Sequence, residues 1–456
     1  MRVIGRNIFS LGLSRIISGV ILFAVQAKLA SYLGPDGFGK YSLVMAFYAI
    51  FFLFIDFGIS RYFIKKVGED GGQTPLYLGN FFIAQFFSSL VIFALFLILP
   101  KIFGYEADVA RAMIIAAVGL LLASMSIPFT ALVQAAQRIH ILAVIYFVDT
   151  ILKAAWFTFA ILSHKDIEFL FWILVVVGAS DLVVFAIATR LIARPKIQAH
   201  RQILREMILY GISFAMLVGF ETLIAKADVV IQKHFLDYDA VGLYSAAYRF
   251  LDFLTFLPAV VAISLFPYFS AQKDIDSSDN RDMSEKIHRF LLAVAVPLGV
   301  GSTVLASNII LTSFGPGYEG AILPFRILIW STVITLFYGV ANVVMQVKAL
   351  KTAIFILLSS TLFNIAGNIV LIPRYGIMAS AWLTVLSYIL VAVLYLIHSR
   401  RYLRFPLWRP MLRPVMSSAV MGFVIWQIRE WNLFLLIGIA MVIYFSILFA
   451  AGFLKK

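Results

Sequence analysis

The sequence predicts an all-α integral membrane protein that crosses the bilayer about fourteen times. Hydrophobic residues make up 62% of the 456-residue chain and charged residues 13%, whereas a soluble domain is about half apolar and about a quarter charged. The apolar runs reach the roughly 20 residues needed to span a hydrocarbon core of about 30 Å. Because these runs are long and do not alternate with polar residues, they predict helices and exclude β-barrel strands.

Fourteen apolar segments are the predicted spanning helices, and the thirteenth is the shortest. Glycine and proline mark the breaks between them, as in Gly34-Pro35 and Gly315-Pro316. The first segment is expected to be a spanning helix and not a signal peptide, because charged and polar residues interrupt it and occupy the expected cleavage region. The segments are 8–33, 42–63, 76–99, 112–133, 141–162, 169–192, 207–233, 242–270, 290–313, 322–346, 353–372, 377–398, 414–428 and 433–454.

The distribution of Lys and Arg predicts the orientation. If the N-terminus is cytoplasmic, about two thirds of the 37 Lys and Arg residues fall on the cytoplasmic side, which is the positive-inside pattern. We therefore expect a multi-pass protein of the inner (plasma) membrane with both termini in the cytoplasm. The same pattern explains the net charge of +14 through anionic lipid contacts, so no nucleic-acid partner is expected.

Several kinds of chemistry are excluded or disfavoured by composition. The chain has no cysteine, and its six histidines are scattered without metal-ligand spacing. No Walker-type glycine loop is present. We expect no cofactor, no metal site and no enzymatic activity.

An internal repeat divides the chain. Residues 33–42 (LGPDGFGKYS) align with 236–245 (LDYDAVGLYS) at an offset of 203, with Leu, Asp, Gly, Tyr and Ser in register. Each half then holds six helices, so both halves start on the same side of the membrane, an arrangement found in transporters. The predicted domains are an N-terminal lobe of residues 1–200, a C-terminal lobe of 201–400, and two appended helices in 401–456.

The repeated turn and several other stretches carry a family resemblance. These stretches are Asp56-Phe57-Gly58-Ile59, Tyr244-Ser245-Ala246-Ala247-Tyr248-Arg249, Leu265-Phe266-Pro267-Tyr268, and Asn364 and Asn368 followed by Leu371 to Ile377. The sequence resembles the polysaccharide or oligosaccharide flippases of O-antigen type, in the multidrug/oligosaccharidyl-lipid/polysaccharide exporter superfamily. It departs from the family at 378–381, where Met-Ala-Ser-Ala replaces a common Gly-Ala-Ala. The resemblance implies two pseudo-symmetric six-helix lobes around a central cavity, and movement of an undecaprenyl-pyrophosphate-linked sugar to the outer leaflet.

Charged residues inside the predicted helices independently indicate a polar route. Each costs about 2.5–3.5 kcal/mol at mid-bilayer, so most must face protein partners or water. Asp149–Lys153 and Arg249–Asp252 have the spacing of local pairs, for which a structural ion pair is the simpler interpretation. The charged residues are Arg15, Lys28, Lys153, Lys226, Arg249, Arg326, Asp56, Asp149, Asp181, Glu221, Asp228 and Asp252.

Two candidate sites follow from these charges. Arginine suits a pyrophosphate because its guanidinium donates paired hydrogen bonds, so we expect Arg15 and Arg249 to bind the headgroup, with Lys28, Lys226, Arg326 and Gln26 as weaker candidates. Snorkelling to the interface is the alternative for Arg15, Lys28 and Asp181. Carboxylates that bind H⁺ or Na⁺ suit ion coupling, and Glu221 and Asp228 are the candidates. Their alternative role is to neutralise Lys226 or cations of the other lobe.

The favoured function is a flippase for a lipid-linked oligosaccharide that works by alternating access and uses an ion gradient or the membrane potential. The alternative is a drug or metabolite exporter of the same superfamily. A membrane glycosyltransferase or polymerase is less favoured because every predicted outer loop is short. A purely structural membrane protein is disfavoured by the intramembrane charges.

Overall fold

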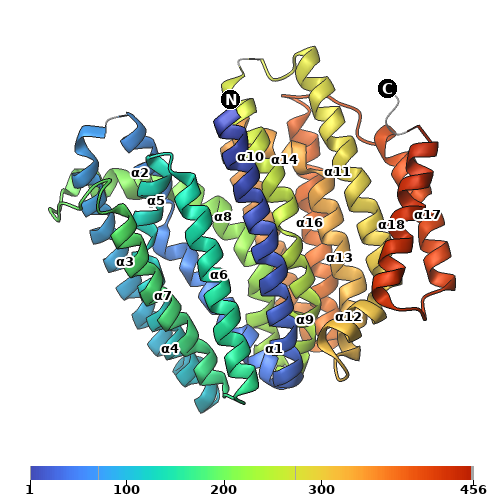
Figure 1. Ribbon diagram of the computed structural model, residues 1–456, viewed down its shortest axis with the longest axis horizontal. Coiled ribbons are helices and arrows are strands. Elements are labelled where there is room, and N and C mark those ends of the chain that lie inside the picture. Colours follow the sequence, from blue (N-terminus) through green and yellow to red (C-terminus); the bar gives the residue numbers. More distant parts are fainter. Residues whose placement is uncertain (1, 70, 273, 453–456) are drawn as a thin grey trace. The chain divides into compact units, whose positions relative to one another are not determined.

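The computed structural model describes residues 2–69, 71–272 and 274–452, and all of their side chains except those of residues 2–16, 71, 139, 263, 264 and 267. Within these residues the chain is helical almost throughout and contains no strand, so the predicted all-α class is confirmed (Figure 1). The chain forms two compact units, one ending at His234 and the other beginning at Phe235.

The first unit contains eight α-helices and a short 3-10 helix in its described residues. They are α1 (Arg2–Asp56), α2 (Ile59–Glu69), η1 (Gly71–Gln73), α3 (Thr74–Phe103), α4 (Ala107–Met125), α5 (Ile127–Ala135), α6 (Ile139–Leu162), α7 (Ile167–Thr189) and α8 (Arg201–Phe235), whose last residue lies beyond the boundary.

The second unit contains ten α-helices and two 3-10 helices over the part of the chain that is described. They are α9 (Tyr238–Leu254), α10 (Phe256–Ala271), α11 (Ser278–Val304), α12 (Ala306–Phe314), η2 (Glu319–Ala321), α13 (Ile322–Phe337), α14 (Gly339–Lys348), α15 (Leu350–Tyr375), α16 (Ile377–Ser399), η3 (Arg409–Met411), α17 (Leu412–Gln427) and α18 (Leu433–Ala450).

The two predicted helices at the start of the chain are one element with a kink. Gly34 alone leaves the helical conformation inside α1, with φ 66° and ψ 174°, and Pro35 follows it. Glycine tolerates the positive φ, and proline suits the first position of the helix that restarts. The predicted loop after residue 33 is therefore replaced by a sharp turn at a single residue.

Among the described residues, 12 helices are long and apolar enough to cross a membrane. The number of spanning helices predicted from the sequence, about fourteen, is higher for two reasons. Ile17–Glu69 counts as one span although it covers two predicted ones on either side of the Gly34 kink. The helix α17 has 16 residues, which is short for a hydrocarbon core of about 30 Å.

The same packing occurs in each unit. In the first, α4 packs on α3 and α7, α6 on α7, and α2 on α5. In the second, α13 packs on α11 and α16, α15 on α16, and α10 on α14. Each unit therefore repeats one arrangement of helices, as the sequence repeat predicts. The boundaries predicted at residues 200 and 400 and the central cavity stay predictions.

The last two helices follow the repeated set. The helix α17 packs on α11, and α18 packs on α17, so the two lie side by side at the end of the chain (Figure 1). Their apolar side chains join Ala293 of α11 in one cluster that includes Met421, Ile425 and Tyr444. Packing against α11 holds them as an addition to the second unit.

The helix α8 crosses the junction of α1 and α2 at two glycines. Gly58 has φ +73°, and a Cβ built on it would lie 2.4 Å from the carbonyl oxygen of Gly211. A Cβ on Gly211 would lie 2.3 Å from the carbonyl oxygen of Phe57, which itself has φ 47°. The backbones therefore touch directly, and this contact fixes α8 against the break that separates α1 from α2.

Candidate functional site

The predicted binding residues of α1 have different environments. The side chain of Arg15 lies outside the described residues, so its predicted role is not tested. Gln26 donates from Nε2 to the Tyr41 hydroxyl at 3.3 Å, while its Oε1 is buried with no hydrogen-bond partner among the described residues. Lys28 is exposed. Gln26 and Lys28 therefore place polar groups on an otherwise apolar helix.

The polar residues of α8 change from exposed to buried along the helix. Glu221 is exposed, Lys226 is half-buried and Asp228 is fully buried. The Oδ1 of Asp228 accepts from the Val229 amide at 2.8 Å. One turn further, Gln232 is fully buried, and neither atom of its amide group has a hydrogen-bond partner in the described part of the chain. Of these polar residues of α8, Asp228 and Gln232 therefore lie inside the protein and Glu221 is exposed.

An arginine that sequence reasoning missed lies next to α8. The guanidinium carbon of Arg61, on α2, lies 4.6 Å from the centre of the Phe214 ring of α8. Arg61 is also within electrostatic range of Glu221 and Asp56. A cation is thus available to Glu221 from a neighbouring helix. One weak signal for Arg61 is its position shortly after Asp56-Phe57-Gly58.

A group of charged residues joins α6 and α7. Lys153 Nζ lies 2.8 Å from Asp149 Oδ2, which confirms the predicted pair. Asp181 of α7 is within electrostatic range of both residues, and Tyr48 of α1 is within range of both carboxyls. The Oδ1 of Asp149 is buried and has no hydrogen-bond partner among the described residues. Two carboxyls with one ammonium can take up one proton or one small cation.

The predicted residues of the second unit lie on α9 and α13. Arg249 Nη1 lies 3.5 Å from Asp252 Oδ2, so the predicted pair is confirmed, and both side chains are half-buried. Arg326 is exposed on α13. Each unit thus has a half-buried ion pair on a spanning helix and an exposed cation on another.

A network of amides and hydroxyls connects α15 and α16. Ser380 Oγ donates to Asn368 Oδ1 at 2.7 Å, and Asn368 Nδ2 donates to Asn364 Oδ1 at 3.1 Å. Asn364 Nδ2 donates to Ser387 Oγ at 3.2 Å. All four side chains are fully buried. Hydrogen bonds between apolar helices hold them in register, so this network is a structural element of the second unit.

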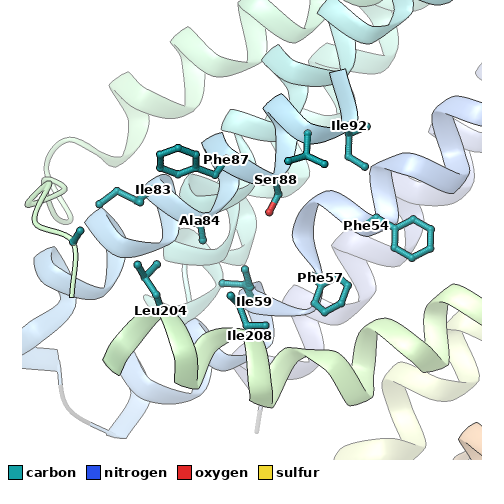
Figure 2. Close-up of a pocket in the computed structure, with 12 residues that line it drawn as sticks. Phe54, Phe57, Ile59, Ile83, Ala84, Phe87, Ser88, Ile92, Leu204 and Ile208 are labelled. Atoms are coloured by element: carbon teal, nitrogen blue, oxygen red, sulfur yellow. The ribbon is translucent and has the colours of Figure 1, made fainter. Parts of the chain in front are cut away.

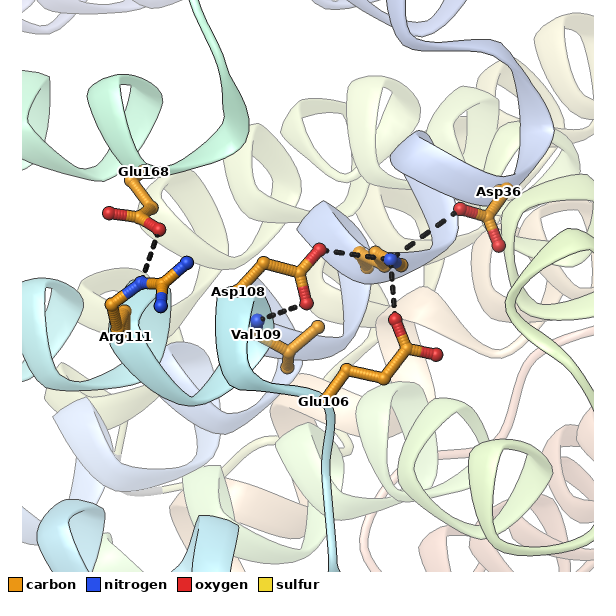
Figure 3. Close-up of polar contacts among 7 residues, drawn as sticks. Asp36, Glu106, Asp108, Val109, Arg111 and Glu168 are labelled. Atoms are coloured by element: carbon orange, nitrogen blue, oxygen red, sulfur yellow. Dashed lines mark hydrogen bonds and ion pairs between the residues drawn. The ribbon is translucent and has the colours of Figure 1, made fainter.

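An ionic cluster ties the Gly34 kink to the start of α4 (Figure 3). Lys40 Nζ lies 2.6 Å from Glu106, 2.9 Å from Asp108 and 3.8 Å from Asp36. Nearby, Arg111 Nε donates to Glu168 Oε1 at 2.5 Å. These contacts link α1, α4 and α7 at the ends predicted to face outward.

The amino-acid sequence is similar to a known family and to two curated proteins. Residues 4–273 match the family model described as "Polysaccharide biosynthesis protein". A "Probable flippase AglR" from Haloferax volcanii is 29% identical over 37% of this chain and 36% of its own length. An uncharacterized membrane protein from Methanocaldococcus jannaschii is 24% identical over 44% of this chain and 40% of its own length. The chain therefore matches less than half the length of these curated relatives.

Solved structures share the fold at low sequence identity. A structure titled "Lipid II flippase MurJ, inward closed conformation" has a TM-score of 0.77 and 15% identity, covering 98% of both chains. An inward-facing multidrug resistance MATE family transporter of the MOP superfamily has a TM-score of 0.62 and 14% identity, covering 86% of this chain and 97% of its own. The fold is thus that of flippases and exporters, and the predicted resemblance is confirmed. Since the family model matches more than half of its residues, this multi-pass membrane chain belongs to the polysaccharide biosynthesis protein family.

Proposed function

We propose that the protein is a flippase that moves an undecaprenyl-pyrophosphate-linked oligosaccharide from the cytoplasmic to the outer leaflet of the inner (plasma) membrane. It works by alternating access, with both termini in the cytoplasm, and surrounding lipids are its other partners. The membership of the polysaccharide biosynthesis protein family supports this function.

One observation carries the proposal. Charged side chains remain exposed on apolar spanning helices, namely Lys28 on α1, Glu221 on α8 and Arg326 on α13. Exposure of such groups to lipid is costly, so these helices require a polar surrounding. A water-filled route for an anionic headgroup supplies it. Cations along that route offset the cost of moving a pyrophosphate, and Arg15, Arg249 and Lys226 are further candidates to bind it.

Ion coupling is the second part of the proposal. A carboxyl in a membrane helix can be protonated or can bind Na⁺ at modest cost. Glu221 and Asp228 are the coupling groups that the sequence predicts, and we add Asp149 and Asp181 because they share one lysine. An ion gradient or the membrane potential then drives the conformational cycle.

The test is transport in reconstituted vesicles. Vesicles containing the purified protein and a labelled undecaprenyl-pyrophosphate oligosaccharide are treated with a membrane-impermeant enzyme that cleaves exposed sugar. The proposal predicts protein-dependent movement of the label between leaflets that stops when ion gradients and the potential are collapsed. The likeness to a multidrug transporter makes drug export the alternative. Drug efflux without movement of the labelled lipid would favour that alternative.

A further inference from the structure

An apolar groove lies on the first unit, where the end of α1, the middle of α3 and the start of α8 meet. Its volume is about 560 Å³, and Figure 2 shows its lining. Phe87 and Ile92 line it from α3, and Leu204 and Ile208 from α8. Among its described lining residues, Ser88 is the one polar side chain. The groove therefore suits a hydrocarbon chain.

One end of the groove marks the level of the membrane interface. Residues 193–200 form no helix and lie against α3. Asn80 Nδ2 donates to the Gln198 carbonyl at 2.9 Å, and the His200 amide donates to Asn80 Oδ1 at 2.8 Å. Irregular backbone is not tolerated where it faces hydrocarbon. The apolar part of the bilayer therefore begins beyond Asn80, next to the groove.

The length of the groove corresponds to one leaflet. Its lining on α3 runs from Ile83 to Ile92, a rise of roughly 13 Å at the helical rise per residue. Half of a hydrocarbon core is about 15 Å. A single acyl chain of one leaflet matches this length, whereas the polyisoprenoid tail of a lipid-linked sugar is much longer than one leaflet.

Positive charge lies at the interfacial end. A second hollow shares Ala199, Leu204 and Ile208 with the groove and is also lined by Arg201 and Arg205. The two arginines are one helical turn apart on α8, on one face, and both are exposed. The neighbouring Glu206 is bonded elsewhere, to Tyr62 at 2.5 Å and to Gln202 at 3.1 Å. An apolar groove with a cationic end is complementary to an anionic amphiphile.

The inner end of the groove is the junction of α1 and α2. Phe57, which lines it, has φ 47°, and the adjoining Gly58 is in backbone contact with Gly211. A hydrocarbon chain in the groove would therefore contact the place where α8 crosses the junction of α1 and α2. Occupancy would hold α1, α3 and α8 at fixed separation.

From these features we infer that the groove binds one acyl chain of an anionic phospholipid, whose phosphate lies against Arg201 and Arg205. The occupant is a structural lipid of the leaflet on the Arg201 side and not the transported lipid, whose polyisoprenoid tail is longer than the groove. A zwitterionic lipid gains less from the two arginines because its headgroup has no net charge.

Native mass spectrometry of the purified full-length protein tests the inference, with phosphatidylglycerol and phosphatidylcholine as probes. The parent is expected to retain one phosphatidylglycerol in preference to phosphatidylcholine. The double variant Arg201→Ala/Arg205→Ala should lose roughly tenfold or more in that retention, because two cations near the headgroup are removed. Ala84→Trp, which fills the groove, should also lose it.

The matched control is Arg190→Ala/Arg194→Ala, which removes the same charge from exposed positions outside both hollows and should retain the lipid as the parent does. Equal retention by the parent and the Arg201/Arg205 variant would overturn the inference, as would equal retention of both lipids. Displacement of phosphatidylglycerol by an equimolar polyisoprenyl phosphate would assign the groove to the transported lipid and would overturn the choice of occupant. If Ala84→Trp does not fold, the retention of phosphatidylglycerol by the Arg201/Arg205 variant and by the Arg190/Arg194 control still tests the inference.

Discussion

Gly58 and Gly211 pack backbone to backbone, and a methyl group on either one would overlap a carbonyl of the opposing segment. Beside this backbone contact, Ile59 of α2 and Met207 of α8 belong to one buried apolar cluster. Small residues that allow close backbone approach are a common device for helix association in membranes. Here the device joins α8 to the turn between α1 and α2.

Gly211→Ala is therefore expected to destabilise the protein by about 1–3 kcal/mol, the usual cost of overpacking. Gly58→Ala should cost about 1–2 kcal/mol more because alanine is strained at a positive φ. Thermal unfolding of detergent-purified protein measures both. Gly68→Ala is the control, since a Cβ there meets open space within α2, and it should be neutral or slightly stabilising because alanine favours a helix. Equal stability of all three variants would refute the close contact.

Substitutions of Asp149 and Lys153 are expected to have coupled effects on the stability of the protein. Lys153→Met should destabilise by about 3 kcal/mol, the low end of the range for breaking a buried pair, because both side chains keep some exposure. Asp149→Asn combined with Lys153→Met should recover part of the loss, since Asp181 is then the one charged residue left in the group. A double-mutant cycle in thermal unfolding measures the coupling. Additive effects of the two substitutions would mean that the residues do not pair.

Asp181→Asn tests ion coupling without breaking that pair. We expect transport to lose its dependence on the ion gradient, because one of the two carboxyls that share Lys153 can no longer bind a cation. Vesicle transport at several proton and Na⁺ gradients measures the effect. An unchanged gradient dependence in a well-folded variant would assign Asp181 a structural role.

Arg15→Ala and Arg249→Ala are expected to abolish flipping while leaving membrane accumulation intact, and Arg→Lys should rescue each only in part, because lysine lacks paired donors. Complementation of a flippase-deficient strain measures function. Arg111→Ala is the control because Arg111 is largely exposed and pairs with Glu168 at the end of α4 that is predicted to face outward. Full complementation by both alanine variants would contradict the cationic site.

Asp276 predicts a pH dependence for a loop of the second unit. Hydrogen bonds from Arg281, and one from the Arg404 amide at 2.9 Å, lower the pKa of the Asp276 carboxyl below its ordinary value. The folded state therefore gains stability above the ordinary pKa, and the gain is lost as the pH falls through the lowered one. Asp276→Asn should be slightly less stable than the parent at pH 7, and the difference should vanish in strong acid. Thermal unfolding across pH tests this, with Asp282→Asn as the control.

The predicted orientation is testable because the chain has no native cysteine. Single substitutions Arg194→Cys and Glu430→Cys lie at exposed positions that the positive-inside pattern assigns to opposite sides. An impermeant thiol reagent added outside intact cells should label the Glu430→Cys protein and not the Arg194→Cys protein. Labelling of both from outside would refute the topology.

Local patterns in the sequence were enough to predict much of this structure. The helices follow from the apolar runs, and the Asp149–Lys153 and Arg249–Asp252 pairs follow from spacings of four and three residues. The contact of Arg61 with Phe214 joins residues far apart in sequence, and no spacing rule foretells it. The loop expected after residue 33 was wrong because a single glycine with positive φ makes the turn.

The ionic cluster of Lys40 has no equivalent at the corresponding position of the second unit. At the repeat offset of 203 the residue is Leu243, and its side chain is so close to Gly320 that a Cβ there would lie 2.8 Å from it. Attraction between exposed charges weakens as salt rises, whereas apolar contact does not. The two halves of the repeat therefore differ in their sensitivity to the medium. High salt would weaken the Lys40 cluster, at the end of the first half that is predicted to face outward, and would leave the apolar contact of Leu243 unchanged.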